Sequence, residues 1–368
     1  MDMAMLDSRV IEEKLQLLVE SFSKILYEED TAFLENMKTS NLAADDISRY
    51  KFWEWTQGVG LYGLWKLYER NRDPRVLSIL TTYYDTQLAG GLPAKNINTV
   101  APLLALSYLY PHVQKEEYLE VCLEWAEWIM HELPRTQEGG FQHITSDTLN
   151  DQELWDDTLF MTVLFLANMG KLTNRTEYMK EAEYQFLLHA KYLSDKYTGL
   201  WYHGWTFNGA GNFAKAFWGR GNCWVTIAIP TFIAMAELSP SIRLYLTCLL
   251  KQQADSLVQY QSRGGMWHTL LDDKDSYLES SATAGFGYGL LLGAHLGLLD
   301  DTVKASAWKA LEPVLACIDG EGVMHQVSYG TPMGRISKDF YKTIPIQPMP
   351  YGQALAILFL LEALEELE

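Results

Sequence analysis

Residues 155–169 read WDDTLFMTVLFLANM, in which two carboxylates are followed by a run that is apolar on nearly every face of a helix. A helix that is apolar all round belongs in the middle of a large protein, because any exposed face would place apolar groups in water. Two further runs of this kind occupy residues 223–238 and 352–364. We therefore expect fully buried inner helices in a predominantly helical chain.

Other segments carry a single apolar stripe, which is typical of outer helices. In residues 115–131 the apolar residues recur at spacings of 4, 3 and 4, with glutamates on the remaining surface. These apolar residues are Tyr118, Cys122, Trp125 and Ile129. Thr173-Asn174 is expected to cap a similar helix over 176–193, and Ser239-Pro240 to begin another. The chain thus alternates inner and outer helices.

A short motif of Gly, apolar or aromatic residues and then His recurs in the loops before inner helices. Its copies are Gly140-Phe-Gln-His143, Gly199-Leu-Trp-Tyr-His203, Gly265-Met-Trp-His268 and Gly322-Val-Met-His325. The four histidines are 60, 65 and 57 residues apart, and a period in this range indicates a repeat architecture. Glycine with aromatic residues in each copy predicts a short extended segment.

Six polar openings precede the inner helices at intervals of 43 to 72 residues. They lie near Trp55-Thr56, Asn98-Thr99, Trp155-Asp156-Asp157, Trp218-Gly-Arg220, Glu279-Ser-Ser and Tyr351-Gly-Gln353. Six inner helices ringed by six outer ones predict an all-α, six-hairpin α/α barrel, or toroid. An open superhelix is the alternative, but strongly apolar inner helices favour closure. No linker divides the chain, so we expect a single domain over residues 1–368.

The composition limits the possible partners. The formal net charge of −18 argues against a nucleic-acid partner, because phosphate binding needs a basic footprint. It also argues against a membrane surface, so an acidic ligand would require a locally basic pocket. The 12 Trp and 21 Tyr residues combine an apolar ring with a polar group, which suits pockets for sugars.

Cysteine usage and apolar runs bear on location and cofactors. Cys122, Cys223, Cys248 and Cys317 are scattered singly, without a CxxC pair or metal-ligand spacing. Residues 1–10 contain acids and no apolar core of signal-peptide length. The apolar stretch over 224–235 is too short to span a bilayer. We expect a cytoplasmic protein with free thiols and without a metal or other cofactor.

In such a barrel every inner helix presents its N-terminus to one rim, so the six openings converge. Free backbone N–H groups and positive helix ends favour an anion there. Asp156 and Asp157 open one of these helices, and one interpretation is that they cap it. The other is that burial keeps one carboxyl protonated as a general acid. Adjacent side chains point in different directions, so only one is expected to do chemistry.

Arg220 lies between two glycines at the mouth of a buried helix. A planar guanidinium there suits bidentate binding of a substrate carboxylate. The alternative is an internal ion pair with an acid such as Glu279.

The loop histidines and three tryptophans are further candidates. The histidines suit metal ligation, proton transfer or hydrogen bonding to sugar hydroxyls, but their spacing matches no metal motif. We expect His143 and His203 to contact a ligand. Trp55, Trp201 and Trp267 either stack on a sugar or pack in the core.

The openings match a known family in their order along the chain. The segments Trp155-Asp-Asp-Thr-Leu-Phe-Met161, Phe217-Trp-Gly-Arg-Gly-Asn222, Glu279-Ser-Ser-Ala282 and Tyr351-Gly-Gln353 resemble glycoside hydrolase family 105. These enzymes are the unsaturated rhamnogalacturonyl hydrolases, related to the unsaturated glucuronyl hydrolases of family 88. The resemblance covers residues 55 to 353, which is nearly the whole chain.

The resemblance implies a six-hairpin barrel and a small unsaturated oligosaccharide, left by pectin lyases, as the substrate. It implies hydration of the C4–C5 double bond of the terminal uronic acid without a metal. By motif, Asp157 is the acid and base, Trp218 and Arg220 bind the uronate, and His203 lies in the pocket. Relatives carry a second pocket aspartate where this chain has Asn98, which departs from the family pattern.

Three other functions fit a barrel of this kind. An ordinary inverting glycosidase needs two carboxylates across the pocket, for which Asp157 and Glu279 are the candidates. An N-acyl sugar epimerase would use pocket histidines as acid and base. A sugar-binding barrel without activity would not require Asp157.

Overall fold

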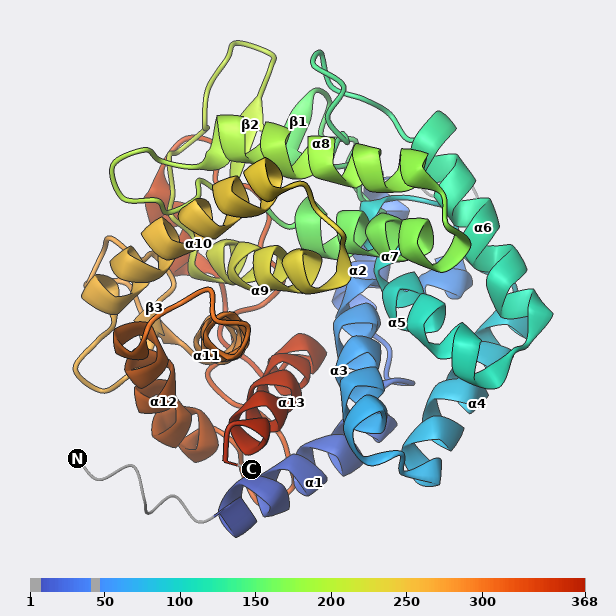
Figure 1. Cartoon of the computed structure of the whole chain (residues 1–368), viewed down its shortest axis with the longest axis horizontal. Helices are drawn as coiled ribbons and strands as arrows, with labels where there is room; N and C mark the ends of the chain where they lie inside the picture. The colour runs from blue at the N-terminus through green and yellow to red at the C-terminus, as the bar shows by residue number, and fades with distance from the viewer. Residues whose placement is uncertain (1–7, 41–46, 368) are drawn as a thin grey trace.

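The computed structural model describes residues 8–40 and 47–367, which form a mostly helical chain (Figure 1). The expectation about the first ten residues falls largely on residues 1–7, which lie outside this description. The inner helices are α3 (Trp55–Asn71), α5 (Ile97–Val113), the π-helical turn η3 (Leu159–Val163) continuing into α7 (Leu164–Thr173), α9 (Gly219–Met235), α11 (Ser280–His295) and α13 (Pro350–Glu365).

The inner helices form a closed ring. Each packs on the next one in chain order, and α13 packs on α3, so no gap is left between the first and the last (Figure 1). All six begin within three residues of the predicted openings. The α/α barrel is therefore confirmed, and the open superhelix is excluded.

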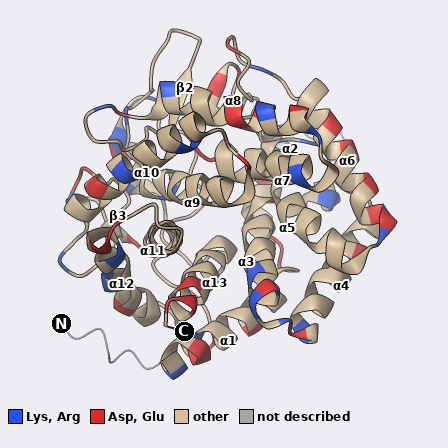
Figure 2. Cartoon of the chain, viewed as in Figure 1, with Lys and Arg blue, Asp and Glu red and all other residues tan. Residues whose placement is uncertain are grey.

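The outer helices cover this ring. They are α1 (Ser8–Ile25), α4 (Pro74–Gly90), α6 (Glu116–His131), α8 (Thr176–Leu193), α10 (Pro240–Tyr260) and α12 (Asp301–Ala316). Five of them follow an inner helix along the chain, whereas α1 packs on α13 from the other end of the sequence. Charged side chains gather on these outer helices and on the loops, while α5, α9 and α11 are nearly free of them (Figure 2).

Cap residues explain where several helices begin. Ser239 accepts a hydrogen bond from the backbone of Ile242, and Pro240 opens α10, as predicted. The cap expected for α8 is wrong, because Asn174 instead ends α7 in the left-handed region, at φ 55°. An asparagine tolerates this conformation and can close a helix in place of glycine. The residue preceding α8 is Arg175, whose side chain makes no capping bond.

Each copy of the loop motif contains a short extended segment, as expected: Trp267-His268 forms a strand, and the other copies pair through antiparallel bridges at Phe141, Trp201 and Met324. Two short strand pairs are present in these loops. Strand β1 (Glu153–Trp155) pairs with β2 (Gly204–Thr206), and β3 (Trp267–His268) pairs with β4 (Leu278–Glu279). A glycine with positive φ turns the chain in each copy of the motif. These are Gly139, Gly199, Gly265 and Gly322, so the turning residue of the first copy is one position earlier than Gly140.

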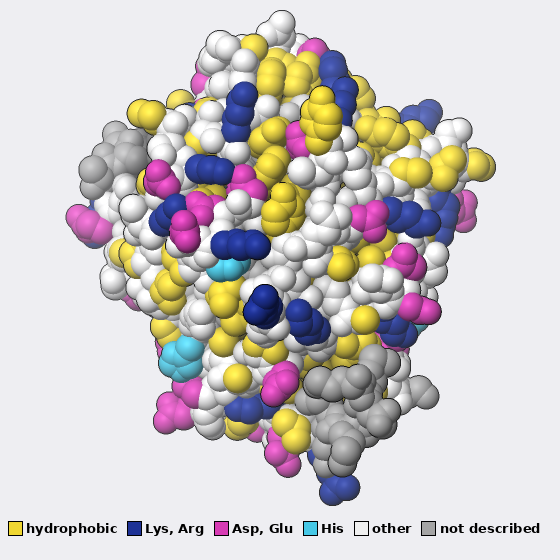
Figure 3. All heavy atoms as spheres, turned by 90° about the vertical axis from the view of Figure 1, so that its left-hand side faces the viewer, with side chains coloured by type: hydrophobic (Ala, Val, Ile, Leu, Met, Phe, Trp, Pro, Cys, Tyr) yellow, Lys and Arg dark blue, Asp and Glu magenta, His cyan; other side chains and the backbone are white. Residues whose placement is uncertain are grey.

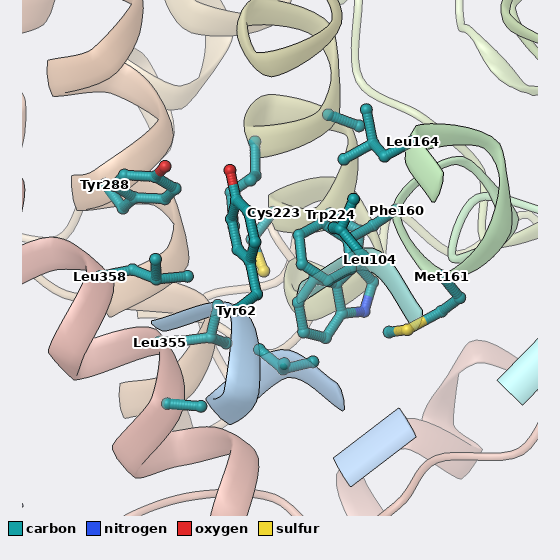
Figure 4. Packing of buried hydrophobic residues seen from close by; sticks show 14 of the residues in the cluster. Tyr62, Leu104, Phe160, Met161, Leu164, Cys223, Trp224, Tyr288, Leu355 and Leu358 are labelled. Carbon is teal, nitrogen blue, oxygen red and sulfur yellow. The ribbon is translucent and has the colours of Figure 1, made fainter. Parts of the chain in front are cut away.

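The core lies on the barrel axis, where side chains from all six inner helices meet (Figure 4). Phe160 packs against the indole of Trp224 with ring centroids 5.1 Å apart, and Tyr62 meets Phe160 edge to face at 6.0 Å. These apolar groups fill the axis, so the open space of the barrel lies at its ends.

The surface in the space-filling view (Figure 3) carries apolar side chains and charges of both signs. On the face shown in Figure 3, Lys and Arg side chains are interspersed with Asp and Glu rather than gathered in one patch. Within residues 8–40 and 47–367, no helix has the combination of length and apolarity needed to cross a bilayer.

Two inner helices meet without a side chain between them at Gly289 of α11. A Cβ atom built there would lie 2.6 Å from the carbonyl oxygen of Thr226 on α9. This backbone-to-backbone approach draws the two helices together and helps the ring to close at a small radius.

We expect Gly289→Ala to lower the free energy of unfolding by about 1–3 kcal/mol, because the added methyl overlaps a backbone oxygen that cannot move alone. Gly90→Ala, at the end of α4, is the matched control, since a Cβ there meets no atom within 4 Å. Chemical denaturation of both variants measures the effect. Equal stability of the two variants would show that the helices separate without penalty.

Candidate functional site

A cleft of about 450 Å³ opens at the end of the barrel where the inner helices begin. Five of the six predicted openings line it, and the sixth, at α11, does not. The lining residues from these openings are Trp55, Thr56, Gln57, Asn98, Trp155, Asp157, Trp218, Arg220 and Tyr351. The volume and the concave shape fit a small-molecule site.

Asp157 and Arg220 both line this cleft. The side chain of Asp157 is 15% exposed, and Asp157 precedes the π-helical turn η3 by two residues. Such turns occur frequently at functional sites, because they displace a helix start from its regular path. The cleft therefore brings together the partly exposed carboxylate of Asp157 and the buried guanidinium of Arg220, which come from neighbouring inner helices.

His203 lies behind Asp157 rather than on the cleft surface. Its Nε2 atom is 3.5 Å from Oδ2 of Asp157, at the outer limit of a hydrogen bond. Its Nδ1 atom is 2.6 Å from the hydroxyl of Tyr341. Burial lowers the pKa of His203, which keeps the ring neutral at pH 7. In the tautomer with the proton on Nε2, the ring presents an N–H to the Asp157 carboxylate and accepts from the Tyr341 hydroxyl at Nδ1.

The two adjacent aspartates differ in charge state. Burial raises the pKa of Asp156 well above its usual range, and the charge of Asp157 raises it further. Burial alone would also raise the pKa of Asp157, but side-chain hydrogen bonds from His203 and Asp156 bring it below its usual value. Asp156 is thus neutral and Asp157 ionised in the free protein.

An arc of closely packed rings, which includes one guanidinium, lies along one side of the site. Successive ring centroids, and the guanidinium carbon between two of the rings, lie between 4.3 and 5.0 Å apart. In order these groups are His143, Trp155, His203, Trp218, Arg220, Tyr351 and Trp55. Contacts between aromatic faces and a cation favour this order, and they fix each group by its neighbours.

Arg220 is tied to the segment over residues 328–331. Its Nη1 donates to the carbonyl and hydroxyl of Ser328, and its Nη2 donates to the carbonyl of Tyr329 and the hydroxyl of Thr331, at 2.5 to 3.1 Å. Only Nε lacks a partner among the described residues. The sequence predicted that the Arg220 guanidinium binds a substrate carboxylate through two hydrogen bonds. Its Nη1 and Nη2 atoms already bind this loop, so they are not free for a carboxylate in this structure.

Glu279 lies outside the cleft and caps α11. It accepts hydrogen bonds from the backbone of Ser281, Ala282 and Ser328, at 2.6 to 3.2 Å. One of its oxygens is 3.9 Å from Nη1 of Arg220. The alternative prediction, an internal ion pair between Arg220 and Glu279, therefore agrees with the structure. The predicted contact of Glu279 with a ligand does not agree with it, because this carboxylate is buried and does not line the cleft.

The remaining candidates divide between the cleft and other parts of the fold. His143 lines the cleft, and its Nδ1 is 2.8 Å from the hydroxyl of Thr158. Asn98 and Trp55 also line it, whereas Trp201 and Trp267 are core residues. Two histidines of the repeated motif stand apart from the cleft. His268 bonds to the carbonyl of Ser276, and His325 is largely exposed beside Asp319.

Sequence reasoning did not single out Glu54, although it lines the cleft and caps α3. Burial raises the pKa of Glu54 to about 8, so this carboxyl is predominantly neutral at pH 7. It lies directly before the opening at Trp55, and this adjacency was the only signal in the sequence. Tyr341, the partner of His203, gave no signal because 138 residues separate the two.

One group of possible metal ligands exists among the described residues, and it coincides with this site. One ligand atom each of Asp156, Asp157 and His203 lie within 4.8 Å of one another. Such a compact set suits either a cation or a shared proton, and the elevated pKa of Asp156 favours the proton.

The geometry agrees with the comparisons with known proteins. The family model described as Glycosyl Hydrolase Family 88 matches residues 30–367. An unsaturated rhamnogalacturonyl hydrolase of Bacillus subtilis (strain 168) is 32% identical over 316 residues, which are 85% of this chain and 90% of that protein.

Solved structures agree over nearly the full length. A possible member of the GH105 family from Salmonella enterica serovar Paratyphi A has a TM-score of 0.90 and 41% identity, covering 100% of this chain and 97% of its own. A possible member of the same family from Klebsiella pneumoniae has a TM-score of 0.88 and 42% identity, covering 96% and 93%.

The buried histidine of the cleft predicts a pH-dependent stability. Burial lowers the pKa of His143 to about 3, from about 6.5 in an unfolded chain. Below pH 6.5 the unfolded state therefore binds a proton that the folded state does not, and stability falls as the pH drops toward 3. We expect the stability difference between wild type and His143→Gln to shrink by about 1.4 kcal/mol per pH unit below pH 6.

Chemical denaturation at pH 7, 5.5 and 4.5 measures this difference. His131→Gln, at the largely exposed end of α6, is the control because it removes a histidine without changing a buried one. A constant difference between wild type and His143→Gln over this range would contradict the neutral, buried state of the ring.

Proposed function

Because the chain belongs to glycosyl hydrolase family 88, we propose that it removes the terminal Δ4,5-unsaturated uronic acid from short pectin-derived oligosaccharides. One observation carries the proposal. Asp157 and Arg220 share a cleft at the N-terminal ends of the inner helices, where an acid, a cation and positive helix ends meet. An anionic, unsaturated sugar needs this combination. The likeness to an unsaturated rhamnogalacturonyl hydrolase supports it.

The uronate binds in the deep part of the cleft. Arg220 supplies a positive charge within the arc of rings, and Trp218 and Trp55 line the cleft beside it. The guanidinium acts here chiefly as a fixed charge, because the loop over 328–331 occupies its fork. Such a fixed charge explains how a protein of net charge −18 binds an anion.

The reaction is a hydration of the enol ether. Asp157, protonated as the anionic substrate binds beside it, transfers its proton to C4, and the resulting cation is centred on C5. Water adds at C5 and returns a proton to the Asp157 carboxylate. The C5 hemiketal then opens at its bond to the ring oxygen, and the hemiacetal left at C1 releases the neighbouring sugar. One carboxyl group performs both proton transfers.

The environment of Asp157 suits this double role. A carboxylic acid with a depressed pKa is a stronger proton donor, which protonation of a carbon atom requires. The anion that remains faces the N–H of His203, so the group is stabilised in the form that follows proton transfer. His203 therefore acts through Asp157, not on the sugar.

The leaving sugar lies toward the mouth of the cleft, against α2 (Thr31–Ser40). Two hydrogen bonds hold this helix in place. At its start, the carboxylate of Asp30 accepts from the hydroxyl of Tyr329 at 3.1 Å. Farther along, the amide of Asn36 donates to Asp147. Phe33 lies between these two hydrogen-bonding residues along the chain. Its ring lines the cleft and forms an apolar surface for a neighbouring sugar.

The competing functions lose support from the same geometry. An inverting glycosidase with Asp157 and Glu279 requires both carboxylates in the cleft, whereas Glu279 caps a helix behind Arg220. An epimerase would draw on several pocket histidines, but only His143 lines the cleft and His203 is neutral behind Asp157.

Two further expectations belong to this proposal. The chain acts as one catalytic domain, because its first and last long helices, α1 and α13, pack on each other. It works in a reducing compartment such as the cytoplasm, because Cys122, Cys223, Cys248 and Cys317 are all free.

We expect Asp157→Asn to reduce kcat by at least about a thousandfold while leaving substrate binding intact, because the amide can neither give nor accept the proton. The assay follows the near-ultraviolet absorbance of the conjugated double bond in an unsaturated rhamnogalacturonan disaccharide. Reaction of wild type in heavy water should place deuterium at C4. An unchanged absorbance with wild type, or product without deuterium at C4, would refute hydration.

The position of the leaving sugar is tested by Phe33→Ala. We expect it to raise KM for the disaccharide roughly threefold to tenfold, from the loss of about 0.5–1.5 kcal/mol of ring contact. The methyl glycoside of the unsaturated uronate, which lacks the second sugar, should show no such change. Tyr197→Ala is the control, because that ring is 96% exposed. Equal effects on both substrates would contradict the proposed position of the leaving sugar beside α2.

A further inference from the structure

Asp156 is a buried carboxyl group to which the proposed reaction assigns no role. Its side chain is 0% exposed, and neither oxygen has a hydrogen-bond donor among the described residues. An ionised carboxylate buried without a donor is very costly, so such a group holds its proton. A neutral carboxyl group carries an O–H, which in turn requires an acceptor.

The acceptor within reach is the neighbouring Asp157. One oxygen of each aspartate and a ring nitrogen of His203 lie within 4.8 Å of one another. The backbone N–H of Asp156 donates to the carbonyl of His203 at 3.0 Å, which fixes the backbone at this position. The three groups thus form one compact cluster behind the cleft.

The packing around Asp156 leaves room for this carboxyl group and little else. A Cβ atom at Gly221 of α9 would lie 2.4 and 2.7 Å from the two oxygens of Asp156. Glycine at position 221 therefore lets the carboxyl group sit against the helix backbone. The side chain is held in place by close packing, and it cannot swing into the cleft without leaving a void.

The titratable groups that face Asp156 come from each element around it. Asp157 belongs to its own segment, His203 to the loop before β2, Cys223 to α9, and Tyr341 to η4 (Lys338–Thr343). Arg220 is the nearby cation on α9, but it is engaged with Glu279 and the loop over 328–331. No group in this set balances a negative charge on Asp156.

Resting on the proposed function, we infer that Asp156 is a positioning residue that stays protonated and donates its O–H to the Asp157 carboxylate. This bond strengthens as Asp157 transfers its proton to C4, because the acceptor then becomes an anion. It weakens again when water returns the proton. Asp156 keeps its own proton throughout, so no proton passes between the two aspartates. The depressed pKa of Asp157 agrees with a donor at this position.

Asparagine tests this assignment, because its amide is an isostere of the neutral acid and donates in the same direction. We expect Asp156→Asn to keep kcat within about threefold of wild type. Asp156→Ala should lower kcat roughly tenfold to a hundredfold, since a charge-assisted hydrogen bond is lost. KM should change less than about twofold. Asp157→Asn, with the same substitution one residue later, is the inactive reference.

A second readout does not depend on turnover. Loss of a donor to the ionised form raises a carboxyl pKa, so the titration of Asp157 should move to higher pH in Asp156→Ala. It should stay near its wild-type position in Asp156→Asn. Carbon-13 NMR of labelled aspartate carboxyls in the ligand-free protein measures this, and circular dichroism reports whether each variant is folded.

Each outcome decides the assignment. A folded Asp156→Asn that is as inactive as Asp157→Asn would show that the proton of Asp156 moves, and would overturn the fixed-donor role. A titration of Asp157 that is unchanged in Asp156→Ala would also overturn it. If wild type fails to hydrate the substrate but the Asp157 titration shifts as expected, the proposed function falls while the Asp156–Asp157 bond stands.

Discussion

Close contact between the backbones of neighbouring inner helices sets the geometry on which this structure depends. At Gly289 the α11 backbone meets the α9 backbone without a side chain between them, and at Gly58 of α3 a Cβ would lie 2.6 Å from the carbonyl carbon of Ala101 on α5. Such contacts keep the ring narrow, so the N-terminal ends of the inner helices are brought into one small area. The cleft is the space that these ends enclose.

The chemistry of the cleft follows from burial and from stacking. In water, a lone arginine would attract an anion only weakly. Held between the rings of Trp218 and Tyr351 and removed from solvent, the Arg220 guanidinium presents a fixed positive charge in a medium of lower dielectric constant. Asp157 stands in the same medium, and the contrast between its pKa and that of Asp156 arises from the donors that each carboxyl meets.

Much of the fold was predictable because it depends on local patterns of apolar and polar residues. The apolar runs mark the inner helices, and the openings at Trp55 and Asp157 mark their first residues, so the ring and its active end follow from periodicity and spacing. The positions of Trp55, Asn98, His143 and Arg220 in one cleft follow from the same symmetry.

Other features depend on contacts between segments that the sequence does not pair. The fork of Arg220 binds the loop over 328–331, more than a hundred residues away, which no local pattern indicates. Glu279 faces a helix end instead of the cleft, because it satisfies the free N–H groups at the start of α11. The helix α2 carries a weak pattern of its own, and only the folded chain shows that it lines the cleft.

The pairing of α13 with both α1 and α3 affects how the protein is made. During synthesis the early helices emerge first, but the wall that holds Tyr351 arrives with residues 350–365. Until then the partial ring exposes the apolar flanks of α3 and α11, and Arg220 lacks one of its two stacking partners. Until these last residues emerge, a nascent chain therefore has exposed apolar surface, which is prone to aggregation, and an incomplete cleft.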